Sequence, residues 1–430
     1  MPGRGETLPG MGRNVVGTGK GRRTFFHEEH SLHIPETDMR ILFVNMYPGD
    51  SGGVEYYITA LARKLGEMGH FCSMVHGGGV PGDTVFRECR AVPELWRHEL
   101  VFATGTREKL DAVMEELAPD IVYLHNIENA GAIRYFAGRS PSVKFVHGYK
   151  SVDPDGKMLL YGPLEANRAP LSPSCFIRAF TRKSMPRSPV KAVKAYLRAS
   201  SALKASSELP AIIAASGHMK QVLADNGLEE ERISVIPYFT DLSGVETRSG
   251  CSGPLLFAGR LAEGKGLDVL LEVLSLIEGD VSLDVVGDGP EKREFSERSR
   301  EMGLSGRVRC HGWSDHFLMG SFYDRCSLLV LPSVWPEPFG ICGIEAAVRG
   351  KPAVAFDVGG VSDWLIDGET GFLIEPYNRK KMAEKIFLLL SDPGLRKAMG
   401  ERAREKALEK YAPSKHIERL MGVFREVVGS

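Results

Sequence analysis

The sequence lacks three features that would each point to a particular class of protein. It has no apolar run near the roughly 18 residues that cross a bilayer, so we predict no membrane-spanning helix. Its 54 basic and 55 acidic residues leave a formal charge of −1, which argues against a nucleic-acid-binding protein. Its seven cysteines are odd in number, scattered and never in a Cys-x-x-Cys pair, so we expect neither a disulfide framework nor a zinc knuckle.

We also predict no export signal at the amino terminus. Arg22 and Arg23 faintly resemble a twin-arginine signal, but no apolar segment follows them. Residues 1–38 are rich in Gly, Arg and His without apolar periodicity, so we expect them to be disordered, and the native chain could start at Met39. Scattered cysteines and no export signal together favour a reducing, cytoplasmic location.

What the chain does contain is a repeated alternation of short apolar strands and amphipathic helices. At 430 residues, with 43% apolar and 25% charged residues, it suits two globular domains of about 200 residues each. The alternation indicates an α/β fold with parallel sheets covered by helices on both faces. A polar stretch at 241–253 is the expected linker between domains at 39–240 and 254–412. We expect strands at 41–45, 71–76, 121–125, 144–147, 212–215, 233–237, 254–260, 282–286, 307–311, 328–332 and 353–356, a helix at 291–302 and a last helix at 413–430.

The most informative motif lies at 336–347, where Glu337 and Glu345 stand on either side of a Pro/Gly turn that opens into a helix. Pro338 fixes the backbone before the turn, and Gly340 allows the backbone to approach a ligand closely. The free N–H groups at the start of the helix form an anion site, so a phosphate could bind there while each carboxylate accepts from a sugar hydroxyl. The alternative is an ordinary helix N-terminus with acidic residues in its first turns.

The segments on both sides of this motif favour the functional interpretation. Residues 328–332 lead in as a strand, and residues 350–360 lead out as a second strand with a glycine turn. With these flanks the motif resembles the Glu-x7-Glu motif of the family 4 retaining glycosyltransferases, which binds the donor nucleotide sugar. The resemblance covers 39–425 and implies the GT-B architecture, two doubly wound Rossmann-like domains facing a central cleft. It also implies that the helix near 413–428 crosses back to the first domain.

A second glycine-rich loop, at 259–267, carries Arg260 and Lys265 between a strand and a helix. Two cations there could neutralise the charge that grows on a nucleoside diphosphate as it leaves. The alternative is a solvated basic loop. The resemblance places both side chains on the donor diphosphate.

In the first domain, Gly52 and Gly53 precede a helix and could present backbone N–H groups to a phosphate, although two adjacent glycines often mark only a turn. His147 and His125 end predicted strands, where catalytic groups collect but structural histidines also occur. The resemblance puts His147 beside the transferred sugar, and we expect His125 to line the cleft. The predicted catalytic residues are His147, Arg260, Lys265 and Glu337, and the predicted donor-binding residues are Gly52, Gly53, Arg260, Lys265, Gly340, Ile341, Cys342 and Glu345.

One Asp-x-Asp pair, Asp153 and Asp155, has the spacing that other glycosyltransferases use to hold a divalent cation. The sequence Pro-Asp-Gly around it is typical of a tight turn, and it does not end a convincing strand. We therefore expect no metal and no cofactor, with the nucleotide sugar as co-substrate.

The segment 178–204 has the strongest local charge asymmetry, because it contains no acidic residue. A solvated helical face would explain it, and so would an interfacial segment that attracts anionic lipid headgroups. A lipid-linked acceptor would make such a membrane contact useful. Its basic residues are Arg178, Arg182, Lys183, Arg187, Lys191, Lys194, Arg198 and Lys204.

Together with the resemblance, these features predict a metal-independent, hexosyltransferase-like enzyme that moves a sugar from a nucleotide donor to an acceptor hydroxyl in surface glycan or glycolipid synthesis. The resemblance implies that the enzyme is retaining. The alternatives are a catalytically silent nucleotide-sugar-binding partner subunit, since fold does not fix function, and a GT-B sugar epimerase. The donor base, the sugar, the acceptor and the oligomeric state do not follow from the sequence.

Overall fold

The computed structural model describes residues 38–49, 52–79, 85–96, 105–160, 165–182, 188–240 and 252–429. The expected disordered tail, apart from Asp38, and most of the expected linker lie outside the described residues. We call residues 38–240 the first half and residues 252–410 the second half.

The first half contains a seven-stranded sheet in the order β3-β2-β1-β4-β5-β8-β9. All of its strand pairs are parallel, as expected when helices connect successive strands. Its inner strand β1 is buried on both faces, which explains its continuous apolar sequence. The strands are β1 (Arg40–Asn45), β2 (Phe71–His76), β3 (Glu88–Ala91), β4 (Ile121–His125), β5 (Ser142–Val146), β8 (Ala211–Ala214) and β9 (Ile233–Val235).

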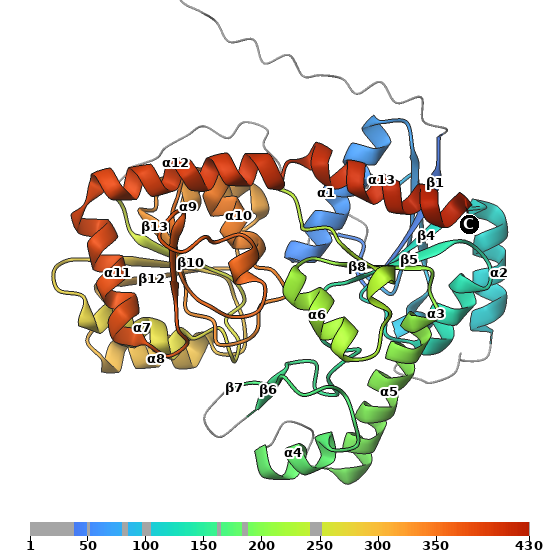
Figure 1. Cartoon of the computed structure of the whole chain (residues 1–430), viewed down its shortest axis with the longest axis horizontal. Coiled ribbons are helices and arrows are strands. Elements are labelled where there is room, and N and C mark those ends of the chain that lie inside the picture. Colours follow the sequence, from blue (N-terminus) through green and yellow to red (C-terminus); the bar gives the residue numbers. More distant parts are fainter. Residues whose placement is uncertain are drawn as a thin grey trace, which may run out of the picture. The chain divides into compact units, whose positions relative to one another are not determined.

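Helices cover both faces of this sheet. Alternate residues of β1 point to opposite faces, and both sets include buried apolar side chains. Phe43 packs in the cluster that includes Leu61, whereas Val44 packs in the cluster that includes Leu110 and Ile133. A short antiparallel pair, with α4 and the start of α5, lies below the sheet in Figure 1. The elements are α1 (Gly53–Glu67), η1 (Pro93–Trp96), α2 (Thr106–Leu117), α3 (Ala130–Ala137), β6 (Leu159–Leu160), β7 (Glu165–Ala166), α4 (Cys175–Arg182), α5 (Pro189–Ser207), α6 (Gly217–Asp225) and η2 (Glu230–Arg232).

The second half repeats the plan with a six-stranded parallel sheet in the order β12-β11-β10-β13-β14-β15. In both sheets the strand order reverses beside the first strand, which is where doubly wound sheets bind ligands. The predicted fold class is therefore confirmed. The strands are β10 (Leu255–Ala258), β11 (Leu283–Val286), β12 (Val308–Gly312), β13 (Leu328–Leu331), β14 (Ala353–Phe356) and β15 (Gly371–Ile374), and the helices are α7 (Leu267–Leu276), α8 (Lys292–Glu301), α9 (His316–Arg325), α10 (Ile341–Val348), η3 (Val361–Asp363), α11 (Arg379–Ser391) and α12 (Pro393–Lys410).

The last helix, α13 (Pro413–Gly429), follows α12 in sequence and packs against the first half. Its His416 Nε2 lies 2.9 Å from the hydroxyl of Tyr57, and its Nδ1 lies 2.7 Å from the carbonyl oxygen of Pro237. The ring of Phe424 meets that of Tyr123 edge to face, with centroids 5.1 Å apart. The carboxy-terminal helix thus joins the two halves through buried side chains.

Four strands were not predicted: the short antiparallel pair β6 and β7, and β3 and β15 of the two parallel sheets. β3 is a half-exposed edge strand whose residues, Glu-Cys-Arg-Ala, show no apolar alternation. β15 opens with Gly371, where a Cβ atom would meet the Ala353 carbonyl oxygen at 2.0 Å, so glycine is required for the approach of β14 rather than for a turn. Because glycine usually weakens a strand, the sequence around Gly371 does not indicate one.

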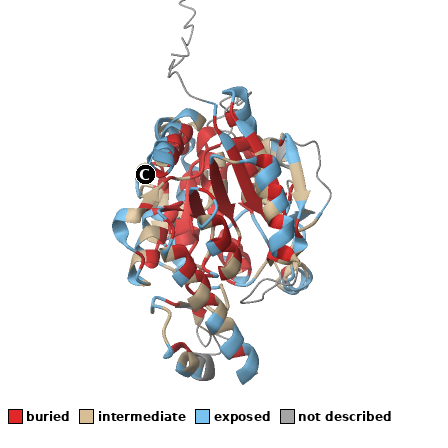
Figure 2. Ribbon diagram, turned by 90° about the vertical axis from the view of Figure 1, so that its right-hand side faces the viewer, coloured by how far each residue is buried: buried red, intermediate tan, exposed pale blue. Residues whose placement is uncertain are grey.

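Burial follows the two sheets. Figure 2 shows buried residues along the strands and exposed residues on the outer sides of the helices. The cysteines at 72, 89, 175, 310, 326 and 342 are free thiols, and Cys251 lies outside the described residues. Within the described ranges, no helix combines the length and apolar character needed to cross a bilayer.

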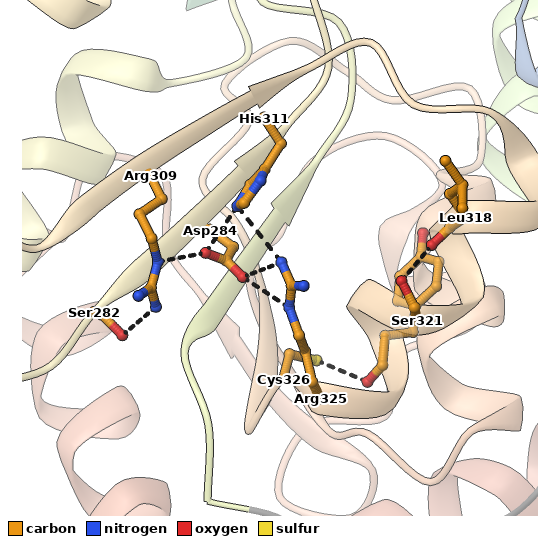
Figure 3. Close-up of polar contacts among 9 residues, drawn as sticks. Ser282, Asp284, Arg309, His311, Leu318, Ser321, Arg325 and Cys326 are labelled. Carbon is orange, nitrogen blue, oxygen red and sulfur yellow. Dashed lines mark hydrogen bonds and ion pairs between the residues drawn. The ribbon is translucent and has the colours of Figure 1, made fainter.

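A buried carboxylate on β11 organises one edge of the second sheet. Asp284 lies within 3.0 Å of Nε of Arg309 and of Nε2 of His311, and it accepts from Nη2 of Arg325 at 2.7 Å (Figure 3). Burial raises the pKa of Asp284, but these three partners outweigh burial and hold it below its ordinary value. Because Asp284 lies toward the amino end of β11, this network stabilises the sheet and leaves the carboxyl edge to ligands.

Candidate functional site

Two loops meet at the carboxyl edge of the second sheet, one after β10 and one after β13. The carbonyl oxygen of Gly264 accepts from the backbone N–H groups of Val334 and Trp335, at 2.8 and 2.9 Å. Gly266 has φ +71°, and a Cβ atom there would lie 1.9 Å from the carbonyl oxygen of Pro332. The two loops can pack this closely only with glycine at that position.

This packing brings the predicted residues Lys265 and Glu337 together. Lys265 Nζ lies 2.7 Å from Oε1 and 2.9 Å from Oε2 of Glu337, and 4.3 Å from the centre of the Trp335 ring. The glutamate is almost fully buried and the lysine partly so. An ammonium group has three donors and each carboxylate oxygen two lone pairs, so the pair retains capacity to bind a phosphate and a sugar hydroxyl.

The backbone around Glu337 is held from three sides. Gly360 N–H donates to the Glu337 carbonyl oxygen at 2.7 Å, from a glycine turn within the second half. From the first half, the hydroxyls of Tyr149 and Ser216 donate to the carbonyl oxygens of Pro336 and Pro338, each at 2.6 Å. Tyr149 and Ser216 therefore fix the loop on both sides of the carboxylate, a role that no sequence pattern indicates.

The helix that follows, α10, begins as the sequence predicts. Gly340 has φ +98°, and the N-terminus of α10 has no side-chain cap. Because the first N–H groups of a helix have no intrahelical partner, those of Ile341 and Cys342 can face a ligand. Burial, followed by the charges of the two glutamates, raises the pKa of Cys342 to about 12, so this residue can contribute its N–H group but not a thiolate.

The glycine loop of the first half lies beside this helix start. A Cβ atom on Gly53 would sit 3.5 Å from Cδ1 of Ile341. Gly52, in an extended conformation with φ −172°, precedes α1, which also has no side-chain cap. Two uncapped helix N-termini, one from each half, therefore meet at one place, and both favour an anion there.

Glu345 lies one turn inside α10, and its Oε2 accepts from the hydroxyl of Tyr323 at 2.6 Å. Burial raises the pKa of Tyr323 well above its ordinary value, so the phenol remains a donor to the carboxylate. Nothing in the sequence indicated Tyr323, because it precedes its partner by a strand and a loop. Its hydroxyl orients Glu345.

Arg260 is exposed on the loop after β10. Its carbonyl oxygen accepts from the N–H group of Ala262 at 3.0 Å, but its side chain makes no hydrogen bond or ion pair with any other described residue. The structure places it on the same loop as Lys265, without a contact to the Lys265–Glu337 pair. An exposed guanidinium can still reach a bound phosphate with two parallel hydrogen bonds.

His147 follows β5 and is held by both ring nitrogens. Its Nε2 lies 2.8 Å from Nδ1 of His125, and its Nδ1 lies 2.6 Å from the hydroxyl of Tyr238. Burial, with a smaller effect of Lys144, lowers the pKa of His147 to about 3. The imidazole is therefore neutral near pH 7 and acts as a hydrogen-bonding group.

The expectation that His125 lines a cleft is wrong. His125 is fully buried beneath His147, and its Nε2 has no hydrogen-bond partner among the described residues. Burial and the neighbouring His147 lower its pKa well below the ordinary value. A histidine at the end of a buried strand points either to the ligand edge or into the core, and periodicity does not distinguish the two.

The Asp-x-Asp pair forms the expected turn. Gly156 N–H donates to the Asp153 carbonyl oxygen at 2.9 Å, and the Asp153 carboxylate accepts from the N–H groups of Lys157 and Met158 at 3.0 and 3.1 Å. Burial raises the pKa of Asp153. Among the residues that the structure describes, no group of three or more His, Cys, Asp or Glu side chains is arranged to hold a metal ion.

A cavity of about 230 Å³ opens at the carboxyl edge of the first sheet, against α5. Beneath it, the buried Lys144 Nζ lies 3.2 Å from Oε2 of Glu128 and 3.2 Å from Oγ of Ser206. A mixture of charges, amides and one indole suits a polyhydroxylated ligand. None of its lining residues was predicted to bind donor or acceptor, although Asp155 was weighed as a metal ligand and Arg198 as a lipid contact. The lining includes Trp96, Asn126, Glu128, Lys150, Asp155 and Arg198.

Two family models match the chain. The model for glycosyl transferases group 1 matches residues 252–406, and the model for glycosyltransferase family 4 matches residues 51–243. The α-D-kanosaminyltransferase of Streptomyces kanamyceticus is 33% identical over 176 residues, covering 40% of this chain and 45% of that protein. The 2-deoxystreptamine N-acetyl-D-glucosaminyltransferase of Niallia circulans is 28% identical over 177 residues, covering 40% and 43%. The chain thus spans less than half the length of these relatives.

Solved structures share the fold over most of the chain. Anabaena HepE in complex with UDP and glucose superposes with a TM-score of 0.66 at 20% identity, covering 90% of this chain and 100% of that one. Sucrose-phosphate synthase from Thermosynechococcus elongatus gives a TM-score of 0.69 at 18% identity, covering 90% and 99%. The two parallel, doubly wound sheets of this chain match the GT-B fold of these structures. The chain belongs to the family 4 glycosyltransferases of this fold.

Proposed function

We propose that this chain transfers a sugar from a nucleoside-diphosphate sugar to an acceptor hydroxyl. The observation that carries the proposal is the meeting of the α1 and α10 N-termini, where Gly53 approaches Ile341, with the Lys265–Glu337 pair on the adjacent loops of the second half. Two relatives are named as sugar transferases, and HepE was solved with UDP and glucose. These names support a nucleotide-sugar donor.

Each predicted residue then has a distinct role. The N–H groups of the two helix starts bind the diphosphate, and Arg260 and Lys265 neutralise the charge that develops on it as it leaves. Glu337 and Glu345 accept hydrogen bonds from hydroxyls of the donor. Because these cations supply the charge that a metal would supply elsewhere, the transfer requires no divalent ion.

The reaction retains the configuration of the sugar. The bond between the anomeric carbon and the diphosphate oxygen breaks, the acceptor oxygen bonds to that carbon on the same face, and the hydroxyl proton passes to the departing diphosphate. With a pKa of about 3, His147 is too weak a base near pH 7 to take that proton. It serves instead as a neutral hydrogen-bonding group beside the transferred sugar.

The acceptor belongs on the first half, where the cavity beside α5 offers polar groups for a glycan. We further propose that the acceptor is a growing surface glycan or glycolipid and that the basic segment at 178–204 attracts the chain to an anionic membrane. Intact Arg260, Lys265, Glu337 and Glu345 favour an enzyme over a silent binding subunit.

An assay of nucleotide release separates the proposal from its alternatives. The full chain is incubated with UDP-, GDP- or ADP-sugars, with and without a mixture of glycan and lipid-linked acceptors. A transferase releases nucleotide faster when acceptor is present and labels the acceptor. An epimerase releases nucleotide equally well without acceptor. A silent subunit binds a donor and releases nothing, and either of these two results would overturn the proposal.

A further inference from the structure

Helices α4 and α5 expose large apolar side chains to solvent. The exposed fractions are 69% for Ile177 on α4 and 63%, 45% and 44% for Val190, Val193 and Leu197 on α5. Isolated exposed apolar residues are common on protein surfaces, but these four are close in sequence and on two successive helices.

The three residues of α5 form one stripe. At about 100° per residue, Val190, Val193 and Leu197 lie within about 60° of one another around the helix. The face that α5 buries carries small side chains, among them Ala192 and Ala199. An ordinary surface helix buries its larger apolar residues. In contrast, α5 leaves these three exposed and packs through small residues and the partly buried Tyr196 and Leu203.

Positive charge lies along one side of this stripe. Lys191 and Lys194 are exposed next to it, and no acidic residue occurs between positions 178 and 204. Lysine stems can lie along an apolar surface while the ammonium groups reach outward to phosphates. The stripe is therefore suited to a surface that is apolar inside and anionic at its boundary.

The structure also limits which basic side chains can contact anionic headgroups beside the stripe. Arg178 turns back on its own segment, because its guanidinium donates to Oγ of Ser174 at 2.8 Å and to the carbonyl oxygen of Pro170 at 3.4 Å. Arg198 lines the cavity of the first half. Lys183, Arg187 and the side chain of Arg182 lie outside the described residues. Among the described basic residues of this segment, Lys191 and Lys194 lie next to the stripe on α5.

We propose that Val190, Val193 and Leu197 insert into the interface of an anionic bilayer, so that α5 is an interfacial anchor and not only a basic surface. The proposal rests on the proposed function and specifies its acceptor as one carried by a membrane lipid. Other residues of α5, including Ala195 and Arg198, line the cavity of the first half. Because a helix is about 10 to 12 Å across, an anchored α5 keeps that cavity within reach of a lipid-borne glycan.

Co-sedimentation of the full chain with vesicles tests the anchor without donor or acceptor. Vesicles of phosphatidylcholine alone and of phosphatidylcholine with phosphatidylglycerol are compared at 0.1 M and 1 M salt, where the Debye length is about 10 Å and about 3 Å. We expect the chain to bind the anionic vesicles at low salt, and a measurable fraction of the chain to stay bound at high salt. Purely electrostatic binding would disappear at 1 M salt and would overturn the insertion.

Two variants separate apolar insertion from charge. Val190→Ser/Val193→Ser/Leu197→Ser should lower vesicle binding at least 10-fold and remove the fraction that stays bound at high salt. Lys191→Gln/Lys194→Gln should remove the preference for anionic vesicles but keep weak binding to neutral ones. A matched control, Leu276→Ser/Phe387→Ser/Leu388→Ser, changes three exposed apolar residues of the second half and should bind like the parent.

Equal binding by the stripe variant and the parent would refute the proposal. So would an oligomeric parent that the stripe variant converts to monomers, because the stripe would then contact a second copy of the chain. Nucleotide-sugar binding by the stripe variant should be unchanged. Loss of vesicle binding with intact nucleotide binding separates failure of the anchor from failure of the proposed function.

Discussion

The two halves of the chain share one plan but place different chemistry after two of their strands, β13 in the second half and β5 in the first. The second half carries an ion pair, Lys265 with Glu337, on loops that glycine brings together. The first half carries a neutral chain of hydrogen bonds, His125 to His147 to Tyr238, in which burial suppresses charge. A leaving diphosphate needs charge and an incoming hydroxyl needs orientation, so the contrast matches a donor side and an acceptor side.

The halves also differ in how their sites depend on each other. Within the first half, His147 is positioned by residues of the same sheet edge. The Glu337 loop of the second half is fixed partly by Tyr149 and Ser216 of the first half. The loop that carries the Lys265–Glu337 pair is therefore fully held only when both halves are in place.

The largest effect is expected from removing a cation of the second half. Lys265→Ala or Arg260→Ala should lower kcat by about 100-fold or more, because a partner of the developing diphosphate charge is lost. Steady-state assays with the best donor would measure this. Lys397→Ala, which removes an exposed lysine of α12 paired with Glu401 at 3.8 Å, should leave the rate unchanged. Near-normal rates for both site variants would contradict the proposal that Arg260 and Lys265 bind the leaving diphosphate.

Acid should weaken the contact between α13 and the first half. Burial lowers the pKa of His416 to about 4, whereas an unfolded histidine has a pKa of about 6.5. Since the unfolded state binds the proton first, stability is full above about pH 6.5 and falls as the pH drops toward 4. From pH 7 to pH 5 this residue alone should cost about 2 kcal/mol of unfolding free energy.

Urea unfolding of the parent and of His416→Gln at both pH values measures this contribution. The variant should be less stable than the parent at pH 7 and should lose less stability on acidification. An identical pH dependence in the two proteins would show that His416 does not titrate as its burial implies.

A smaller effect should follow from releasing the Glu337 loop. Tyr149→Phe and Ser216→Ala each remove a hydroxyl that donates to a buried carbonyl oxygen, at a cost of about 1 kcal/mol or about 5-fold in kcat/KM. Tyr135→Phe is the matched control, because its hydroxyl donates to Asp111 away from both ligand edges. If the control and the site variants had equal effects, the first half would not position the charged loop.

The smallest effect concerns metal ions. Added EDTA should leave the transfer rate almost unchanged, because Arg260 and Lys265 supply positive charge at the diphosphate. A strict requirement for magnesium or manganese would contradict this prediction. It would indicate that Asp153 and Asp155 hold the metal ion, although Asp153 takes part in a turn.

Much of the second half could be predicted from its sequence because its chemistry is local. Glu337, Gly340 and Glu345 lie within a single turn-and-helix motif, and Lys265 follows a glycine loop of the same kind. The supporting hydroxyls of Tyr323 and Tyr149 could not be found this way, since each meets its partner only after the chain has folded. The cavity against α5 does not follow from the sequence for the same reason.

The most direct test of the donor assignment is a thermal-shift panel of UDP-, GDP- and ADP-sugars on the full chain. At a concentration 100 times its Kd, a ligand that binds only the folded state stabilises it by about 2.7 kcal/mol. The account predicts that one nucleotide class raises the Tm of the parent and of Lys397→Ala, and that Lys265→Ala loses most of this increase. No shift with any donor, or an undiminished shift in Lys265→Ala, would contradict it.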